Sequence, residues 1–74
     1  MTYFELVNLS SGNRIGEFDS EEAALRDVRD VVKDRGPKAI AAIALTQEDD
    51  AGNGKILAEG DELVRLAERS AVAA

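Results

Sequence analysis

One short acidic stretch holds the side chains of this chain that could most readily do chemistry. Residues 46–60 read TQEDDAGNGKILAEG, with two aspartates and an asparagine near Gly52 and Gly54. Such oxygen ligands could surround a calcium ion, but an EF-hand count from Asp49 meets Ala51 at the third position and Gly60 at the twelfth. Asp, Asn and Gly also favour tight turns, so we expect a hairpin bend and no metal site.

The residue types needed for most catalysis are missing. There is no histidine and no cysteine, which excludes the common nucleophile–base pairs and most zinc sites. The stretch SSGNRIG lacks the lysine of a phosphate-binding loop. Most of the fifteen acidic residues fall in helix caps, helix faces or turns, whereas Glu5 and Glu17 lie inside expected strands, where they can face solvent. We therefore predict no catalytic residue, no cofactor and no enzymatic activity.

Charge and composition restrict the class of partner. The net charge of −6 disfavours binding to nucleic acid, although it permits a basic protein partner or serves only to keep the protein dispersed. The first residues lack the pattern of a signal peptide, and no apolar run is long enough to span a membrane. We expect a cytoplasmic bacterial protein without a disulfide.

Six regular elements and one ambiguous segment follow from the sequence pattern. Branched and aromatic runs, helix-start signals and the Gly36–Pro37 stop predict strands over Thr2–Leu9, Arg14–Phe18, Ala42–Glu48 and Lys55–Glu59, and helices over Ser20–Arg35 and Asp61–Ser70. Asp19 or Ser20 can cap the first helix, and Pro37 can open one further helical turn.

This order predicts an α+β fold, ββαββα, with a four-stranded antiparallel sheet and two helices packed mainly on one face. Residues 1–70 would form a single small domain and residues 71–74 a frayed tail. Apolar residues on both sides of the first strand leave an exposed patch on the other face, for which we predict Tyr3, Val7 and Phe18. We expect this patch to bind a protein partner or a second copy in a homodimer.

A basic stripe on the first helix is a second candidate surface. Arg26, Arg29 and Lys33 follow one another at helical spacing in an otherwise acidic chain. They could bind an acidic segment, or they could form a solvated face on which Arg26 pairs with Glu22 and Asp30.

The stretch FDSEEAALRDVRDVV after a hairpin resembles the opening ββα portion of HicB-type antitoxins, over about Tyr3–Val32. The chain lacks the FPDLPG segment of that family and a DNA-binding segment after it. The resemblance suggests an inhibitor that neutralises a basic partner. Our first hypothesis is a non-catalytic interaction or regulatory module. A small-ligand binder or carboxylate-based enzyme is a further alternative.

Overall fold

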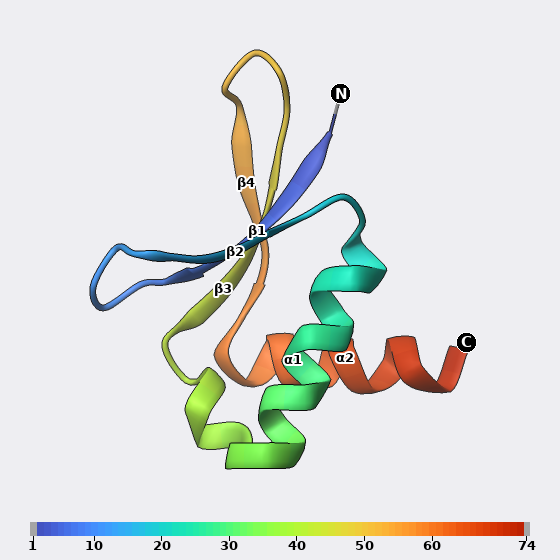
Figure 1. Ribbon diagram of the computed structural model, residues 1–74. Helices are drawn as coiled ribbons and strands as arrows, with labels where there is room; N and C mark the ends of the chain where they lie inside the picture. Colours follow the sequence, from blue (N-terminus) through green and yellow to red (C-terminus); the bar gives the residue numbers. More distant parts are fainter. Residues whose placement is uncertain (1, 74) are drawn as a thin grey trace.

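The computed structural model describes residues 2–73, and their order is the predicted ββαββα (Figure 1). The strands are β1 (Tyr3–Asn8), β2 (Arg14–Phe18), β3 (Ile43–Glu48) and β4 (Gly54–Glu59), and the helices are α1 (Glu21–Arg35), the 3-10 turn η1 (Pro37–Ile40) and α2 (Gly60–Ala73). The α+β prediction is confirmed, because the four strands form one antiparallel sheet in the order β2-β1-β3-β4.

Local signals fix the ends of α1. Ser20 is the N-cap, and its hydroxyl accepts a hydrogen bond of 3.1 Å from the amide of Ala23. At the other end Gly36 adopts φ 88°, a conformation that residues with a Cβ rarely take, and its amide donates to the carbonyl of Val32. Pro37 then begins η1, as its fixed φ angle favours.

The core lies between the sheet and the two helices. Leu6 of β1 and Leu45 of β3 are opposite one another in the ladder, and both are buried. Leu25 and Val28 of α1 and Leu63 of α2 belong to the same apolar cluster, so both helices cover the same face of the sheet. We call it the covered face.

Both edge strands contain an irregularity of register. The β1–β2 ladder shifts between Leu6 and Val7, where β2 inserts Ile15, and the β3–β4 ladder shifts between Leu45 and Thr46, where β4 inserts Leu57. Bulges at both edges interrupt the rows of backbone groups that another strand would pair with. The two edges of the sheet are therefore poor sites for adding a strand from another chain.

The second helix differs most from its prediction. It begins at Gly60 and continues to Ala73, so residues 71–73, predicted as part of a frayed tail, are helical, while residue 74 lies outside the described residues. The sequence of this end is rich in alanine, the residue that disturbs a helix least. Within residues 2–73, neither helix has the length and apolarity that membrane crossing requires.

Candidate interaction surface

The side of the sheet opposite the helices carries a mixed surface that we call the open face. Strand alternation and the ladder registers place ten residues there: Tyr3, Glu5 and Val7 of β1, Arg14 and Glu17 of β2, Ala44, Thr46 and Glu48 of β3, and Ile56 and Glu59 of β4. Tyr3 and Val7 are half-buried and Ile56 is 54% exposed. The open face therefore combines an apolar strip with several carboxylates.

An arginine organises the carboxylates at one side of the open face. Arg14 Nη1 lies 3.1 Å from Glu5 Oε2 and 3.2 Å from Glu17 Oε2. Glu5 and Glu17 are opposite one another in the ladder, so without Arg14 their charges would repel. The hydrogen bond to Glu5, followed by the charges of Glu5 and Glu17, raises the pKa of the Arg14 guanidinium. The Glu5 side chain is 13% exposed and is therefore less accessible than that of Glu17, which is 56% exposed.

Tyr3 lies among the same charged groups. Partial burial, and then the carboxylates of Glu5, Glu48 and Glu17, raise the pKa of its hydroxyl. The phenol therefore stays protonated at neutral pH and offers a hydrogen-bond donor beside an apolar ring. This combination is frequent in contact surfaces between proteins.

Thr46 lies at the centre of the open face, opposite Glu5 on one side and Ile56 on the other. Its hydroxyl is buried and finds no hydrogen-bond partner among the described residues. Nearby, the Glu48 carboxylate lies over Gly54, where a Cβ would collide with it. Because Gly54 has no side chain, the Glu48 side chain has room to lie across β4.

Phe18, which was predicted to belong to the exposed patch, lies on the covered face instead. Phe18 is directly opposite Phe4, and both side chains pack against the core on the covered face. The Phe18 ring lies over Gly16, whose missing side chain makes room for it. Because a shift of register by one residue reverses the side of every residue in a strand, sequence alone could not place Phe18 correctly.

The predicted basic stripe on α1 is divided by its contacts. Arg29 donates from Nη1 to the carbonyl of Ala67 at 3.1 Å and from Nη2 to Glu22 at 3.0 Å, and so ties α1 to α2. Arg26 and Lys33 are exposed, and Lys33 lines a hollow of about 160 Å³ between the helices. Arg29, the middle residue of the stripe, is therefore committed to the fold, which favours the interpretation of a structural and solvated face.

The acidic stretch that follows Glu48 forms the bend between β3 and β4. Asp49 Oδ1 accepts hydrogen bonds from the amides of Ala51 at 3.0 Å and Asn53 at 2.9 Å, and Gly52 has φ 82°. The hydrogen bond from the Asn53 amide is the main cause that lowers the pKa of the Asp49 carboxyl. These bonds are the turn chemistry that the sequence predicts, and they occupy the Asp49 carboxylate within the loop.

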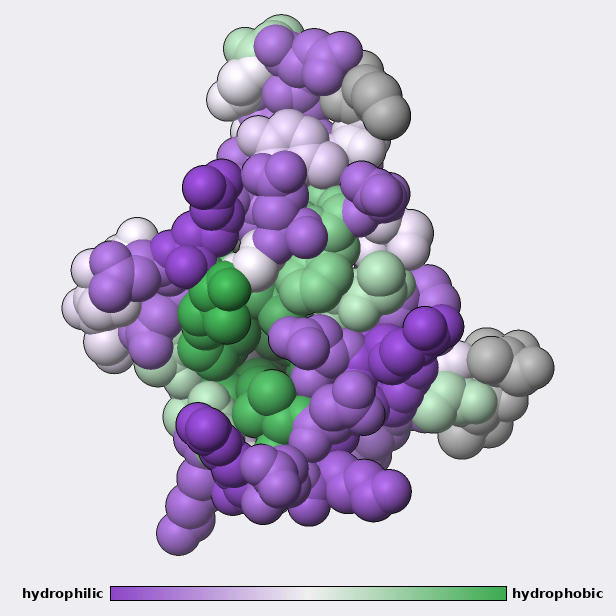
Figure 2. Space-filling model, viewed as in Figure 1, coloured by the Kyte–Doolittle hydropathy of each residue, from purple (hydrophilic) through white to green (hydrophobic). Residues whose placement is uncertain are grey.

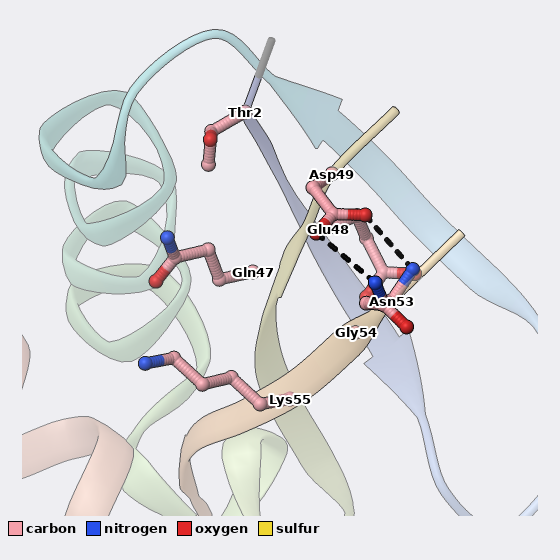
Figure 3. Close-up of a pocket in the computed structure, with 7 residues that line it drawn as sticks. All are labelled: Thr2, Gln47, Glu48, Asp49, Asn53, Gly54 and Lys55. Atoms are coloured by element: carbon pink, nitrogen blue, oxygen red, sulfur yellow. Dashed lines mark hydrogen bonds between the residues drawn. The ribbon is translucent and has the colours of Figure 1, made fainter. Parts of the chain in front are cut away.

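A polar hollow of about 280 Å³ lies beside this bend (Figure 3). Gln47 of β3 and Lys55 of β4 extend to the same side, while Asp49 and Asn53 bond to one another at its end. Within residues 2–73, no three His, Cys, Asp or Glu side chains gather into a group that could hold a metal ion. The hollow offers a few polar groups to a small molecule, but no buried charge to hold one.

A second apolar area lies on the covered side, between the β1–β2 hairpin and α1. Figure 2 shows apolar surface gathered there within a polar surround. Ile15, 53% exposed, stands beside a hollow of about 250 Å³ whose lining includes Val31, Ile40 and Ile43, with Asp27 and Arg35 among its polar members. Ile15 and Ile56 are thus almost equally exposed isoleucines that belong to different surfaces.

The sequence-based alternative of a carboxylate enzyme depended on a buried Glu5 or Glu17 in a pocket. Glu5 is mostly buried, but it is paired with Arg14, and neither residue lines the three hollows described above. Glu17 is 56% exposed. The geometry offers no argument for acid–base chemistry at this pair.

Comparison with known proteins gives no family or relative. No protein-family model matches the chain, and no curated protein and no solved structure matches it. The resemblance to HicB-type antitoxins therefore gains no support from these searches, and the functional argument rests on the surfaces of the molecule itself.

For the exposed patch, sequence reasoning named Tyr3 and Val7 among the open-face residues, but it did not name Thr46, Glu48 or Ile56. Their strands were predicted, but the partner of each residue across the sheet depends on the bulges and the register. The alternation of Ile43 and Leu45 with Ala44 and Thr46 was the available signal, since it predicts that Thr46 lies on the opposite side from the core.

Proposed function

We propose that this chain is a non-catalytic protein-interaction module that binds its partner through the open face. The observation that carries the proposal is that both helices contribute to one core on one side of the sheet. The other side, which neither helix covers, presents Tyr3, Val7 and Ile56 among charged groups. An aromatic hydroxyl and aliphatic side chains within a charged border are typical of contact surfaces.

The bulges in the edge strands add a second reason to favour a face. A partner that added a strand to β2 or β4 would meet an interrupted ladder at Ile15 or Leu57. A partner that docks on the open face needs no backbone pairing, and the sheet presents its side chains on strands rather than on loops.

Ile56 and Ile15 provide a matched test, since they are 54% and 53% exposed and lie on different surfaces. The protein would be tagged and recovered from its source organism, as wild type and as the variants Ile56→Ser and Ile15→Ser. We expect a protein that co-purifies with the wild type to be lost with Ile56→Ser and kept with Ile15→Ser. Loss with Ile15→Ser alone would place the interface at the hollow beside α1 and refute the proposal.

A homodimer through the same surface, an antitoxin-like inhibitory role, a cytoplasmic location and a bacterial origin stay predictions from the sequence. Sedimentation tests the first of them. A concentration-dependent dimer that Ile56→Ser abolishes would make a second copy the partner, whereas a monomer at high concentration would refute the homodimer.

A further inference from the structure

The charge of the open face indicates what kind of partner fits it, and this inference rests on the proposed function. Four carboxylates, those of Glu5, Glu17, Glu48 and Glu59, stand there against one guanidinium, that of Arg14. Four negative charges against one positive charge leave −3, which is half of the formal net charge of −6 of the whole chain. Half of the imbalance is thus concentrated on ten residues.

Arg14 is the one cation among the described residues of the open face, and it is already engaged. Arg14 Nη1 lies within 3.2 Å of both Glu5 and Glu17, so the positive charge of Arg14 is already balanced by carboxylates within the surface. Among the described residues of the open face, no second cation lies opposite Glu48 or Glu59, which belong to the other two strands. An incoming cation would meet these two carboxylates on the β3–β4 half of the open face, away from Arg14 on β2.

A second copy fits this surface poorly. A two-fold contact through the open face would bring the same surplus of carboxylates together from both sides, and opposed like charges oppose association. A surface with lysine or arginine around an apolar centre avoids this cost. It would cover Tyr3, Val7 and Ile56 and bring its cations to the unbalanced carboxylates.

We infer that the partner of the open face is a protein surface in which basic side chains flank an apolar residue, and not a second copy of this chain. The apolar residue contacts Val7 and Ile56, and the basic side chains pair with Glu48 and Glu59. Charge complementarity of this kind speeds the encounter and selects the partner more than it adds affinity.

The test uses amide spectra of the ¹⁵N-labelled full chain titrated with a blocked hexapeptide that alternates lysine with valine. A peptide with glutamate in place of lysine is the control probe. We expect the lysine peptide alone to shift amides of β1, β3 and β4, around Val7, Thr46 and Ile56. The binding should weaken when salt is raised from about 20 mM to about 200 mM, because exposed charges are then screened.

Two double variants with the same change in net charge separate location from overall charge. Glu48→Gln with Glu59→Gln neutralises the two open-face carboxylates that the inference pairs with the partner, whereas Asp34→Asn with Glu62→Gln neutralises two groups of the helices, 82% and 72% exposed. We expect the first to weaken peptide binding roughly three- to tenfold and the second to weaken it less than about twofold.

Equal weakening by both double variants, no binding of the lysine peptide, or concentration-dependent shifts of the same amides without peptide would each overturn the inference. None of these results touches the proposed function, which fails instead if Ile56→Ser leaves capture of the partner unchanged. The two failures are therefore distinguishable.

Discussion

The two faces of the sheet are made of alternate residues of the same four strands, yet they differ in how their buried groups are satisfied. On the covered face Leu6 and Leu45 belong to the apolar core cluster and are almost inaccessible. On the open face Glu5 is mostly buried beside another carboxylate, and the Thr46 hydroxyl is buried without a bond in the described chain.

This difference separates the residues that stabilise the fold from those that are available to recognise a partner. The covered face follows the rules of a folding core, whereas the open face contains like charges and an unsatisfied hydroxyl, which weaken a fold. Departures from those rules concentrate where a surface has another use. The predictions below test that contrast, beginning with the largest expected effect.

The strongest test removes apolar volume from each face in turn. Leu45→Ala, at a fully buried position, is expected to lower the free energy of unfolding by about 2–5 kcal/mol, a large part of what so small a domain has. Ile56→Ala should cost less than about 1 kcal/mol, because its side chain is half exposed. Urea unfolding measures both, and similar losses would mean that the open face is a second core.

The next test asks whether Arg29, the middle residue of the basic stripe, stabilises the packing of α1 against α2 on the covered face. Arg29→Met keeps the aliphatic stem but removes the hydrogen bonds to Ala67 and Glu22, and we expect a loss of about 1–2 kcal/mol. Arg26→Met, on the same helix and exposed, serves as the control and should change the unfolding free energy little. An equal response of the two variants would show that Arg29 does not tie the helices together.

A smaller change of opposite sign is expected on the open face. Thr46→Val preserves the branched shape and removes the unsatisfied hydroxyl, so the free energy of unfolding should rise by about 1 kcal/mol. Thr46→Ser, which keeps the hydroxyl and loses the methyl group, should lower it. A less stable valine variant in thermal unfolding would mean that the hydroxyl is in fact bonded.

The smallest effect concerns pH. Hydrogen bonds from Ser70 first, and then from Arg29, lower the pKa of the Glu22 carboxyl below its ordinary value of 4.5. The stabilisation is therefore complete above about pH 4.5 and is lost as pH falls through the lowered pKa. Glu22→Gln should unfold more readily than wild type at pH 6, with the difference shrinking toward pH 3. A difference that stays constant across this range would contradict the account.

The sequence predicted the elements whose signals are local. Ser20 caps α1 and Gly36 ends it, as expected, and β2 has the predicted bounds. Of the two cap candidates, Asp19 and Ser20, the cap is Ser20, because its hydroxyl accepts the hydrogen bond from the Ala23 amide.

The parts that the sequence could not predict depend on pairing across long separations. Phe18 was placed on the wrong side because its position follows from the register against Phe4. The hydrogen bond from Arg29 to Ala67 joins residues that are 38 positions apart, and no pattern within α1 predicts it. Tyr3 and Val7 were assigned to the open face correctly, because alternation within a single strand suffices for them.

The central claim is that the open face, and not the hollow beside α1, meets the partner. Cross-saturation from the protonated partner to methyl groups of the deuterated chain tests it most directly, since both surfaces carry methyl probes. The account predicts attenuation of the Val7 and Ile56 methyl signals with that of Ile15 unchanged. Attenuation of Ile15, with Val7 and Ile56 unchanged, would contradict it.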